Sequence, residues 1–199
     1  DATPAAFGAH AGNRGNFASI ATDYLEHSRP EVLLGGGGFG LSTTSCAAAG
    51  YTVVVNRDEL LDPAKTDGPR LAGLFGGTSM PYELDGLGNL PHLHEMTRVA
   101  LRALSTDPDG FFLMVEGGII DYGGHANHLP RTVAEVLEFE NAVNEAVTWA
   151  QTHPDTLILV TADHETGGLE VMNDNGAGEY PDVQWSTRGR TASPVPVYA

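Results

Sequence analysis

The stretch FFLMVEGGIIDYGGHANHLPRT, residues 111–132, indicates both the fold and the chemistry of this chain. An apolar run, Phe111 to Val115, is typical of a buried strand and leads directly into a carboxylate, Glu116. Asp121 and His125 follow four positions apart, so they share one face if the segment is helical, although Gly123 and Gly124 favour a loop. Carboxylate and imidazole side chains beside a strand end indicate a metal site.

A second apolar run, TLILV at residues 156–160, leads into another such pair, Asp163 and His164, within TADHETGG. Successive strand residues point to opposite faces of a sheet. Both side chains can therefore approach one site only where the chain bends, unless each serves a neighbouring metal ion.

The remaining segments predict strands and helices in alternation. Strands are expected in EVLLGGGG (31–38) and YTVVV (51–55), helices over 15–28, 90–105 and 131–151, and a loop with little regular structure over 62–90. Continuous apolar strands indicate an α/β fold, a mostly parallel sheet flanked by helices on both faces. In such sheets ligands bind at the carboxyl ends of the strands, where Glu116, Asp163 and His164 fall.

Composition limits the class of protein. With 199 residues, 41% of them apolar, the chain can bury a core and is expected to form one domain. No apolar run approaches the ~20 residues that span a bilayer, and any secretion signal lies outside the printed sequence. A net charge of −16 disfavours nucleic acid and anionic membranes and attracts divalent cations. One cysteine, Cys46, permits neither an intrachain disulfide nor a thiolate metal site.

The cations are nine arginines and a single lysine, Lys65. Surplus carboxylates with little lysine suit a halophilic protein, because salt screens the self-repulsion of the acidic surface. An ordinary acidic secreted enzyme is the alternative interpretation.

Each candidate ligand also has a purely structural interpretation. Glu116 would serve in a salt bridge or helix cap, and Asp163 in a turn after its strand. Histidine with carboxylates suits Zn²⁺, whereas oxygen ligands alone suit Mg²⁺. Among the other histidines, only His128 lies close enough in sequence to this motif to be expected to hydrogen-bond to a metal ligand. Gly35 to Gly40 matches the G-x-G-x-x-G dinucleotide fingerprint, with Glu59 about 20 residues on, but four consecutive glycines equally form a tight loop.

Together these segments resemble the alkaline phosphatase family. The resemblance covers FFLMVEGG, the following D-x₃-H and VTADHETGG. It extends to DATPAAFGAH at the start, RPEVLLGGG, GYTVVVNRDEL, MPYEL, LPHLHEMT and VPVYA at the end. It implies the C-terminal portion of a zinc- and magnesium-dependent phosphomonoesterase, secreted or periplasmic and commonly a homodimer.

The resemblance also implies a role for each residue. Thr3 and Glu116 would bind Mg²⁺, with Asp1 nearby through water. Asp121 and His125 would hold one Zn²⁺, and Asp163 and His164 the second. Arg14 would bind the phosphate of a monoester through its planar guanidinium.

Two departures from the family pattern stand out. The family's serine nucleophile lies upstream of DATPA, so an N-terminal segment of the same enzyme would have to supply it. The family's third histidine for the first zinc falls at Arg190, which has no lone pair to offer. Three interpretations therefore stay open: a phosphatase whose nucleophile lies outside this chain, a non-catalytic metal-binding relative, and a nicotinamide-dependent oxidoreductase built on the glycine loop.

Overall fold

The computed structural model describes residues 2–199, which divide into two compact units. One unit comprises the described residues up to 81 together with 86–116, and the other comprises 82–85 and 117–199. Asp1, expected near magnesium, lies outside the described residues. The single domain predicted from length remains a prediction.

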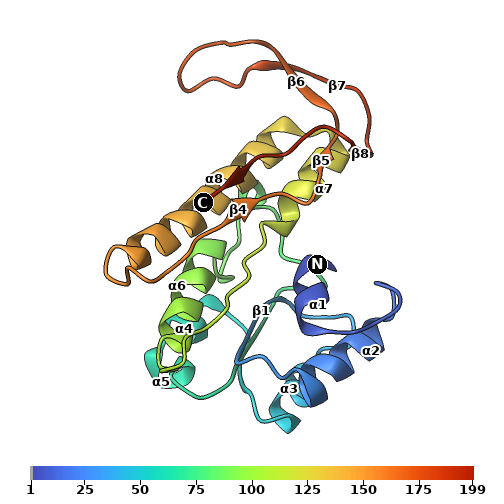
Figure 1. Ribbon diagram of the computed structural model, residues 1–199. Coiled ribbons are helices and arrows are strands. Elements are labelled where there is room, and N and C mark those ends of the chain that lie inside the picture. The colour runs from blue at the N-terminus through green and yellow to red at the C-terminus, as the bar shows by residue number, and fades with distance from the viewer. Residues whose placement is uncertain (1) are drawn as a thin grey trace. The chain divides into compact units, whose positions relative to one another are not determined.

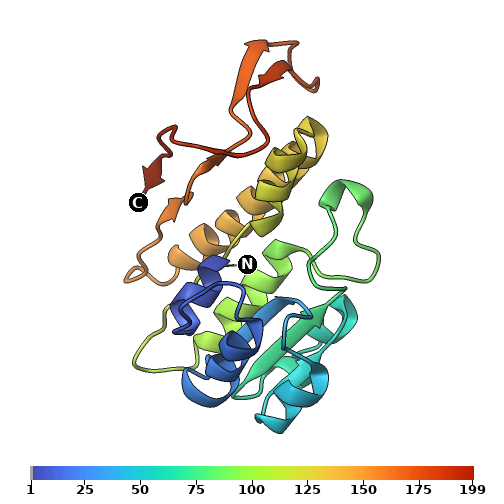
Figure 2. The same cartoon turned by 90° about the vertical axis from the view of Figure 1, so that its right-hand side faces the viewer.

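A three-stranded parallel sheet of order β1-β3-β2 forms the centre of the first unit (Figures 1 and 2). Its elements are α1 (Ala2–Gly8), α2 (Phe17–Thr22), the π-helical η1 (Asp23–His27), β1 (Val32–Gly36), α3 (Thr43–Ala48), β2 (Thr52–Val54), α4 (Arg57–Leu61), α5 (Pro63–Thr66), β3 (Leu71–Phe75) and α6 (Leu93–Leu104). The helices near 15–28 and 90–105 and the strands near 31–38 and 51–55 are thus confirmed.

Side chains of β3 alternate between two cores on opposite faces of the sheet. Leu71 and Phe75 pack with Leu60 of α4 and Val99 of α6, whereas the opposite face packs against Cys46 of α3. The predicted α/β architecture, with helices on both faces of a parallel sheet, is therefore confirmed. The prediction of a loop with little regular structure over residues 62–90 is wrong in part, because this segment contains the fully buried central strand β3. Gly73 and the surrounding Gly, Pro and Asp residues concealed that strand.

The second unit holds the short helix η2 (Glu83–Asp85), α7 (Gly118–Ala126), α8 (Leu129–Ala150) and three two-stranded pairs. Its strands are β4 (Val160–Thr161), β5 (Glu165–Thr166), β6 (Leu169–Asn173), β7 (Asp182–Trp185), β8 (Arg190–Thr191) and β9 (Val197–Tyr198). They pair antiparallel as β4–β9, β5–β8 and β6–β7. The helix expected over 131–151 is confirmed and begins at Leu129.

The strand predicted at residues 111–115 is wrong, and the strand predicted at 156–160 is confirmed only at its last residue. Residues 111–115 belong to no strand, and of the run from 156 to 160 only Val160 does, followed by Thr161. Both runs have strand composition, but a ladder also requires a neighbouring strand to hydrogen-bond with. Phe112 and Leu157 are consequently exposed, at 68% and 75%. Among the described residues, no helix is long and apolar enough to cross a membrane.

Candidate metal centre

The first metal-ligand pair stands on a helix rather than on the expected loop. Asp121 and His125 both lie on α7, and their four-residue spacing places them on one face, with Asp121 Oδ2 3.4 Å from His125 Nε2. The glycines that favoured a loop serve close packing instead. A Cβ at Gly123 would lie 2.7 Å from Thr132 Oγ1, and one at Gly124 would lie 2.9 Å from Thr166 O. The α7 backbone must pass β5 and α8 closely, so only glycine fits there.

The residue after α7 explains why this helix ends where it does. Asn127 adopts a left-handed conformation with φ 53° and caps the helix, its N–H donating to the carbonyl of Gly124. His128 then begins α8, and its Nδ1 accepts the backbone N–H of Arg131 at 3.2 Å. His128 thus supports the turn between the two helices.

The second pair lies at a bend between β4 and β5. There the His164 Nε2 atom is 3.0 Å from Asp163 Oδ2, and the Asp163 carboxylate also accepts the backbone N–H of His164 at 3.1 Å. The bend brings two sequence neighbours to the same side, as the alternation of strand side chains required. His164 is largely buried, whereas Asp163 is exposed.

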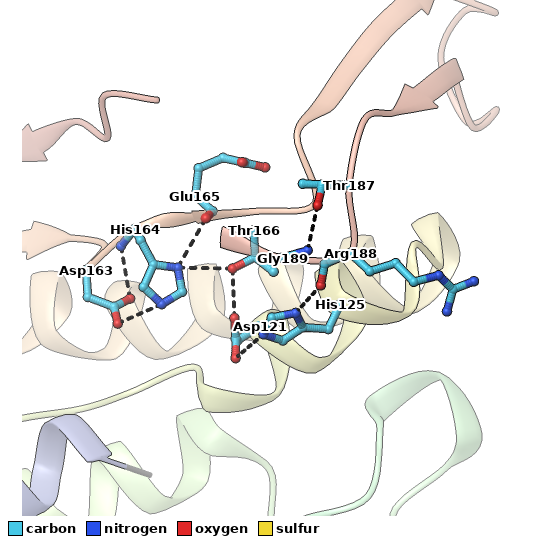
Figure 3. Close-up of polar contacts among 9 residues, drawn as sticks. All are labelled: Asp121, His125, Asp163, His164, Glu165, Thr166, Thr187, Arg188 and Gly189. Carbon is cyan, nitrogen blue, oxygen red and sulfur yellow. Dashed lines mark hydrogen bonds and ion pairs between the residues drawn. The ribbon is translucent and has the colours of Figure 1, made fainter. Parts of the chain in front are cut away.

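Thr166 joins the two pairs in the second unit (Figure 3). Its hydroxyl donates to Asp121 Oδ1 at 2.8 Å and lies 3.0 Å from His164 Nδ1. Sequence reasoning missed this residue, because a threonine after DHE carries no metal-ligand signal. Its role depends on contacts across 45 residues of chain.

Hydrogen-bond partners favour one tautomer of each histidine. His125 Nδ1 lies 2.5 Å from the carbonyl of Arg188, and His164 Nδ1 lies 3.2 Å from the carbonyl of Glu165. A carbonyl can only accept, so these contacts favour a proton on each Nδ1 atom. A neutral ring then has its lone pair on Nε2, the atom that faces a carboxylate. Ligating histidines are held in this way by their outer partners.

Each pair therefore offers two donors, an imidazole nitrogen and a carboxylate oxygen, at a spacing compatible with a zinc ion. A bare Nε2 and a carboxylate oxygen repel each other, so a proton or metal cation must lie between them. In a tetrahedral site with bonds of about 2.0–2.2 Å, neighbouring ligand atoms are about 3.3 Å apart. The observed separations of 3.4 Å and 3.0 Å fit that geometry.

Glu165 ties the strand that carries Arg190 to the centre. Its carboxylate accepts the backbone N–H of Gly168 at 2.8 Å and the hydroxyl of Thr191 at 2.5 Å. β8 consequently lies beside β5, with Arg190 paired to Thr166. The position of the family's third histidine thus adjoins the centre, but an exposed arginine stands there.

The expected magnesium and phosphate residues lie in the first unit. Thr3 is on α1, Arg14 follows it in the loop before α2, and Glu116 ends the extended run after α6. The Phe7 ring of α1 packs on Phe112, with centroids 5.1 Å apart, which holds α1 against the run ending in Glu116. Burial, together with the negative charge of Glu116, raises the pKa of Tyr24 to about 12.

The glycine run has a packing explanation. A Cβ at Gly36 would lie 2.8 Å from the Cα atom of Ser79, and one at Gly38 would lie 3.2 Å from the Cα atom of Thr78. Residues 78–79 thus press against this loop, and close backbone approach accounts for both glycines without a nucleotide.

Comparison with known proteins agrees with this geometry. The family model described as alkaline phosphatase matches residues 41–199. Alkaline phosphatase 3 of Bacillus subtilis is 38% identical over 184 residues, which are 87% of this chain and 39% of that protein. Alkaline phosphatase H of Pseudomonas aeruginosa is 32% identical over 82% of this chain and 46% of its own length. The chain thus spans less than half the length of these curated relatives.

Solved structures show the same likeness. Alkaline phosphatase from the Antarctic bacterium TAB5 superposes with a TM-score of 0.81 at 35% identity, covering 98% of this chain and 60% of that one. A mutant of the TAB5 protein, at a TM-score of 0.82 over 99% of this chain and 61% of its own, has Mg bound in its M3 site. The Thermus thermophilus enzyme gives 0.78 at 35% identity, covering 86% and 38%.

Proposed function

Because this chain belongs to the alkaline phosphatase family, we propose that it forms the metal-binding C-terminal portion of a phosphomonoesterase. One observation supports this above the others: in both histidine–carboxylate pairs, Nδ1 lies within hydrogen-bonding distance of a backbone carbonyl while Nε2 faces the carboxylate. That arrangement prepares two separate nitrogen–oxygen sites for cations.

Asp121 and His125 would hold one Zn²⁺, and Asp163 with His164 the other. Two bound zinc ions supply a clamp for the attacking and leaving oxygens of an in-line displacement and an acidified water. Thr3 and Glu116 would hold Mg²⁺, with Asp1 nearby. Oxygen ligands alone suit that harder ion.

Arg14 would orient the substrate. Its guanidinium offers a planar fork of N–H donors that can bind two oxygens of a phosphate monoester at once. Its positive charge also offsets, locally, the repulsion between an anionic ester and a chain of net charge −16. The serine nucleophile would come from the N-terminal segment of the same enzyme.

The other expectations from the family are proposals of the same kind. We expect a homodimer that acts on phosphate monoesters outside the cytoplasm, in the periplasm or the medium. Binding of nucleic acid is disfavoured by the charge of the chain.

Complementation tests the proposed activity. The 199-residue chain would be fused behind the serine-bearing N-terminal segment of alkaline phosphatase 3 of Bacillus subtilis and assayed with p-nitrophenyl phosphate and zinc. We expect turnover from the fusion, none from the chain alone, and none from the fusion carrying Asp163→Ala. Rapid turnover by the isolated chain would overturn the assignment of the nucleophile to another segment.

Arg190 favours a second candidate function, a metal-binding protein of this family without catalysis. A catalytic zinc normally has three protein ligands, and the first pair has two here. A fusion that binds zinc fully, as measured by elemental analysis, but hydrolyses no ester would favour this alternative.

A further inference from the structure

We infer that Thr166 is a positioning residue that couples the two histidine–carboxylate pairs, holding His164 and Asp121 in the orientation that each needs to bind metal. The inference rests on the proposed function of these pairs. It concerns only residues of the second unit (Figure 3).

The direction of each hydrogen bond follows from the chemistry of the groups. Thr166 has one hydroxyl proton, which it donates to the Asp121 carboxylate at 2.8 Å. Its oxygen can then only accept from His164 Nδ1, 3.0 Å away. A directed chain results, from the His164 ring through the Thr166 hydroxyl to Asp121.

The chain acts on both pairs at once. At one end it holds the proton on His164 Nδ1 and so leaves the Nε2 lone pair directed at Asp163. At the other end it occupies Oδ1 of Asp121, so that Oδ2 is the oxygen left facing His125 Nε2 at 3.4 Å. Hydrogen bonds in series polarise one another, so loss of the hydroxyl should affect both pairs.

The position of Thr166 is itself strongly constrained. Thr166 is partly buried, and its backbone pairs with Arg190 in the β5–β8 ladder. Its carbonyl and methyl atoms approach Gly124 so closely that a Cβ there would lie 2.9 Å from the Thr166 oxygen. The hydroxyl is therefore fixed from two sides, as a positioning residue requires.

Thr166→Val tests the inference, since valine keeps the shape and removes the hydroxyl. Thr166→Ser keeps the hydroxyl. Thr161→Val is the matched control, because the Thr161 hydroxyl donates to the backbone carbonyls of Ala162 and Pro196 in the same unit. Circular dichroism and thermal melting would establish that all three variants fold.

Two readouts are measured on the 199-residue chain. Competition with a chromophoric chelator gives the zinc affinities, and we expect Thr166→Val to weaken zinc at both pairs by roughly 10- to 100-fold, the usual effect of losing an outer partner. Thr166→Ser and Thr161→Val should remain within a few fold of the parent. Weakening at one pair only, or at neither, would overturn the coupling.

The second readout needs no metal. Nitrogen-15 chemical shifts of the His164 ring, recorded well above the ordinary histidine pKa of about 6.5, report which nitrogen carries the proton. We expect a smaller fraction of the Nδ1–H form in Thr166→Val than in the parent or Thr166→Ser, because the variant lacks the hydroxyl acceptor beside Nδ1. Unchanged shifts would overturn the positioning role. If the parent bound no zinc, the phosphatase proposal would fail while these shifts still decided the role of Thr166.

Discussion

Arg190 lies directly opposite Thr166 in the antiparallel β5–β8 pair. Side chains of directly opposed residues project from the same face of a ladder, with Cβ atoms about 4.5–5.5 Å apart. Because the Thr166 hydroxyl binds Asp121, the side chain at position 190 belongs beside the first metal-ligand pair. An arginine there brings a positive charge and no lone pair.

Arg190→His should therefore complete this site. We expect zinc at Asp121 and His125 to bind at least about tenfold more tightly, since a direct ligand should contribute no less than an outer partner does. Arg190→Gln is the control, because it removes the charge without adding an imidazole. Chelator competition measures both, and equal affinities in the two variants would show that charge alone limits the site.

Tyr24 should make the fold sensitive to high pH. Burial and the charge of Glu116 raise its pKa from 10.0 to about 12 in the folded chain. The folded state thus retains a proton that the unfolded state loses, and this stabilisation is complete below pH 10 and lost between about pH 10 and 12. The full loss is about 3 kcal/mol, since each pKa unit corresponds to about 1.4 kcal/mol.

Chemical denaturation at a series of pH values checks this. The parent should lose stability steadily above pH 10, the ordinary pKa of tyrosine, whereas Tyr24→Phe should show a flatter profile. Glu116→Gln should change the pH profile of stability only slightly, because burial is a larger cause of the raised Tyr24 pKa than the charge of Glu116. Identical slopes in the parent and Tyr24→Phe would contradict the assignment.

Arg57→Ala should destabilise the first unit. The Glu95 carboxylate is 3% exposed and accepts the Arg57 guanidinium at 2.6 Å. Burial acts to raise the pKa of Glu95, but hydrogen bonds from Arg57 and from the backbone of His92 outweigh it and lower the pKa overall. Removing Arg57 leaves a buried charge unpaired, at a cost of about 3 kcal/mol.

Urea denaturation at neutral pH measures that loss. It should shrink as pH falls through the folded pKa of Glu95, because a depressed carboxyl pKa stabilises only above the unfolded value. Lys65→Ala, which breaks an exposed pair with Glu59, is the control and should cost less than about 1 kcal/mol. A similar cost for both variants would contradict the buried-charge argument.

Salt should stabilise the chain if its charge reflects a halophilic origin. With a net charge of −16, repulsion within the folded state falls as ions screen it. We expect the melting temperature to rise between low salt and molar KCl, and to rise at least as much in KCl as in NaCl. A melting temperature that stays level would identify an ordinary acidic protein instead.

Much of this protein could be predicted from the sequence. The strands around Leu34 and Val53 follow from short apolar runs, and the helices around Val99 and Glu138 follow from apolar residues spaced along one face. The two Asp–His pairs were also visible in the sequence as candidate ligands, and their role in binding metal stays a prediction. The family resemblance rested on the same segments, and the family is confirmed.

Local patterns failed where contacts distant in sequence decide the outcome. Gly73 lies in the central strand, and Gly123 and Gly124 lie in a helix, although glycine in a sequence usually indicates a turn or loop. In both places the packing of neighbouring segments requires a small residue. Strand composition at 111–115 produced no ladder, since pairing depends on a partner strand.

The sequence by itself determined which side chains could bind metal at Asp121, His125, Asp163 and His164. Only the tertiary structure decided which nitrogen of each ring faces a carboxylate, that Thr166 links the pairs, and that Arg190 adjoins them. The physical reason is that a residue type carries the chemistry, whereas hydrogen bonds and strand register require atoms that folding brings together, as in the contacts of His125 with Arg188 and of Thr166 with Asp121.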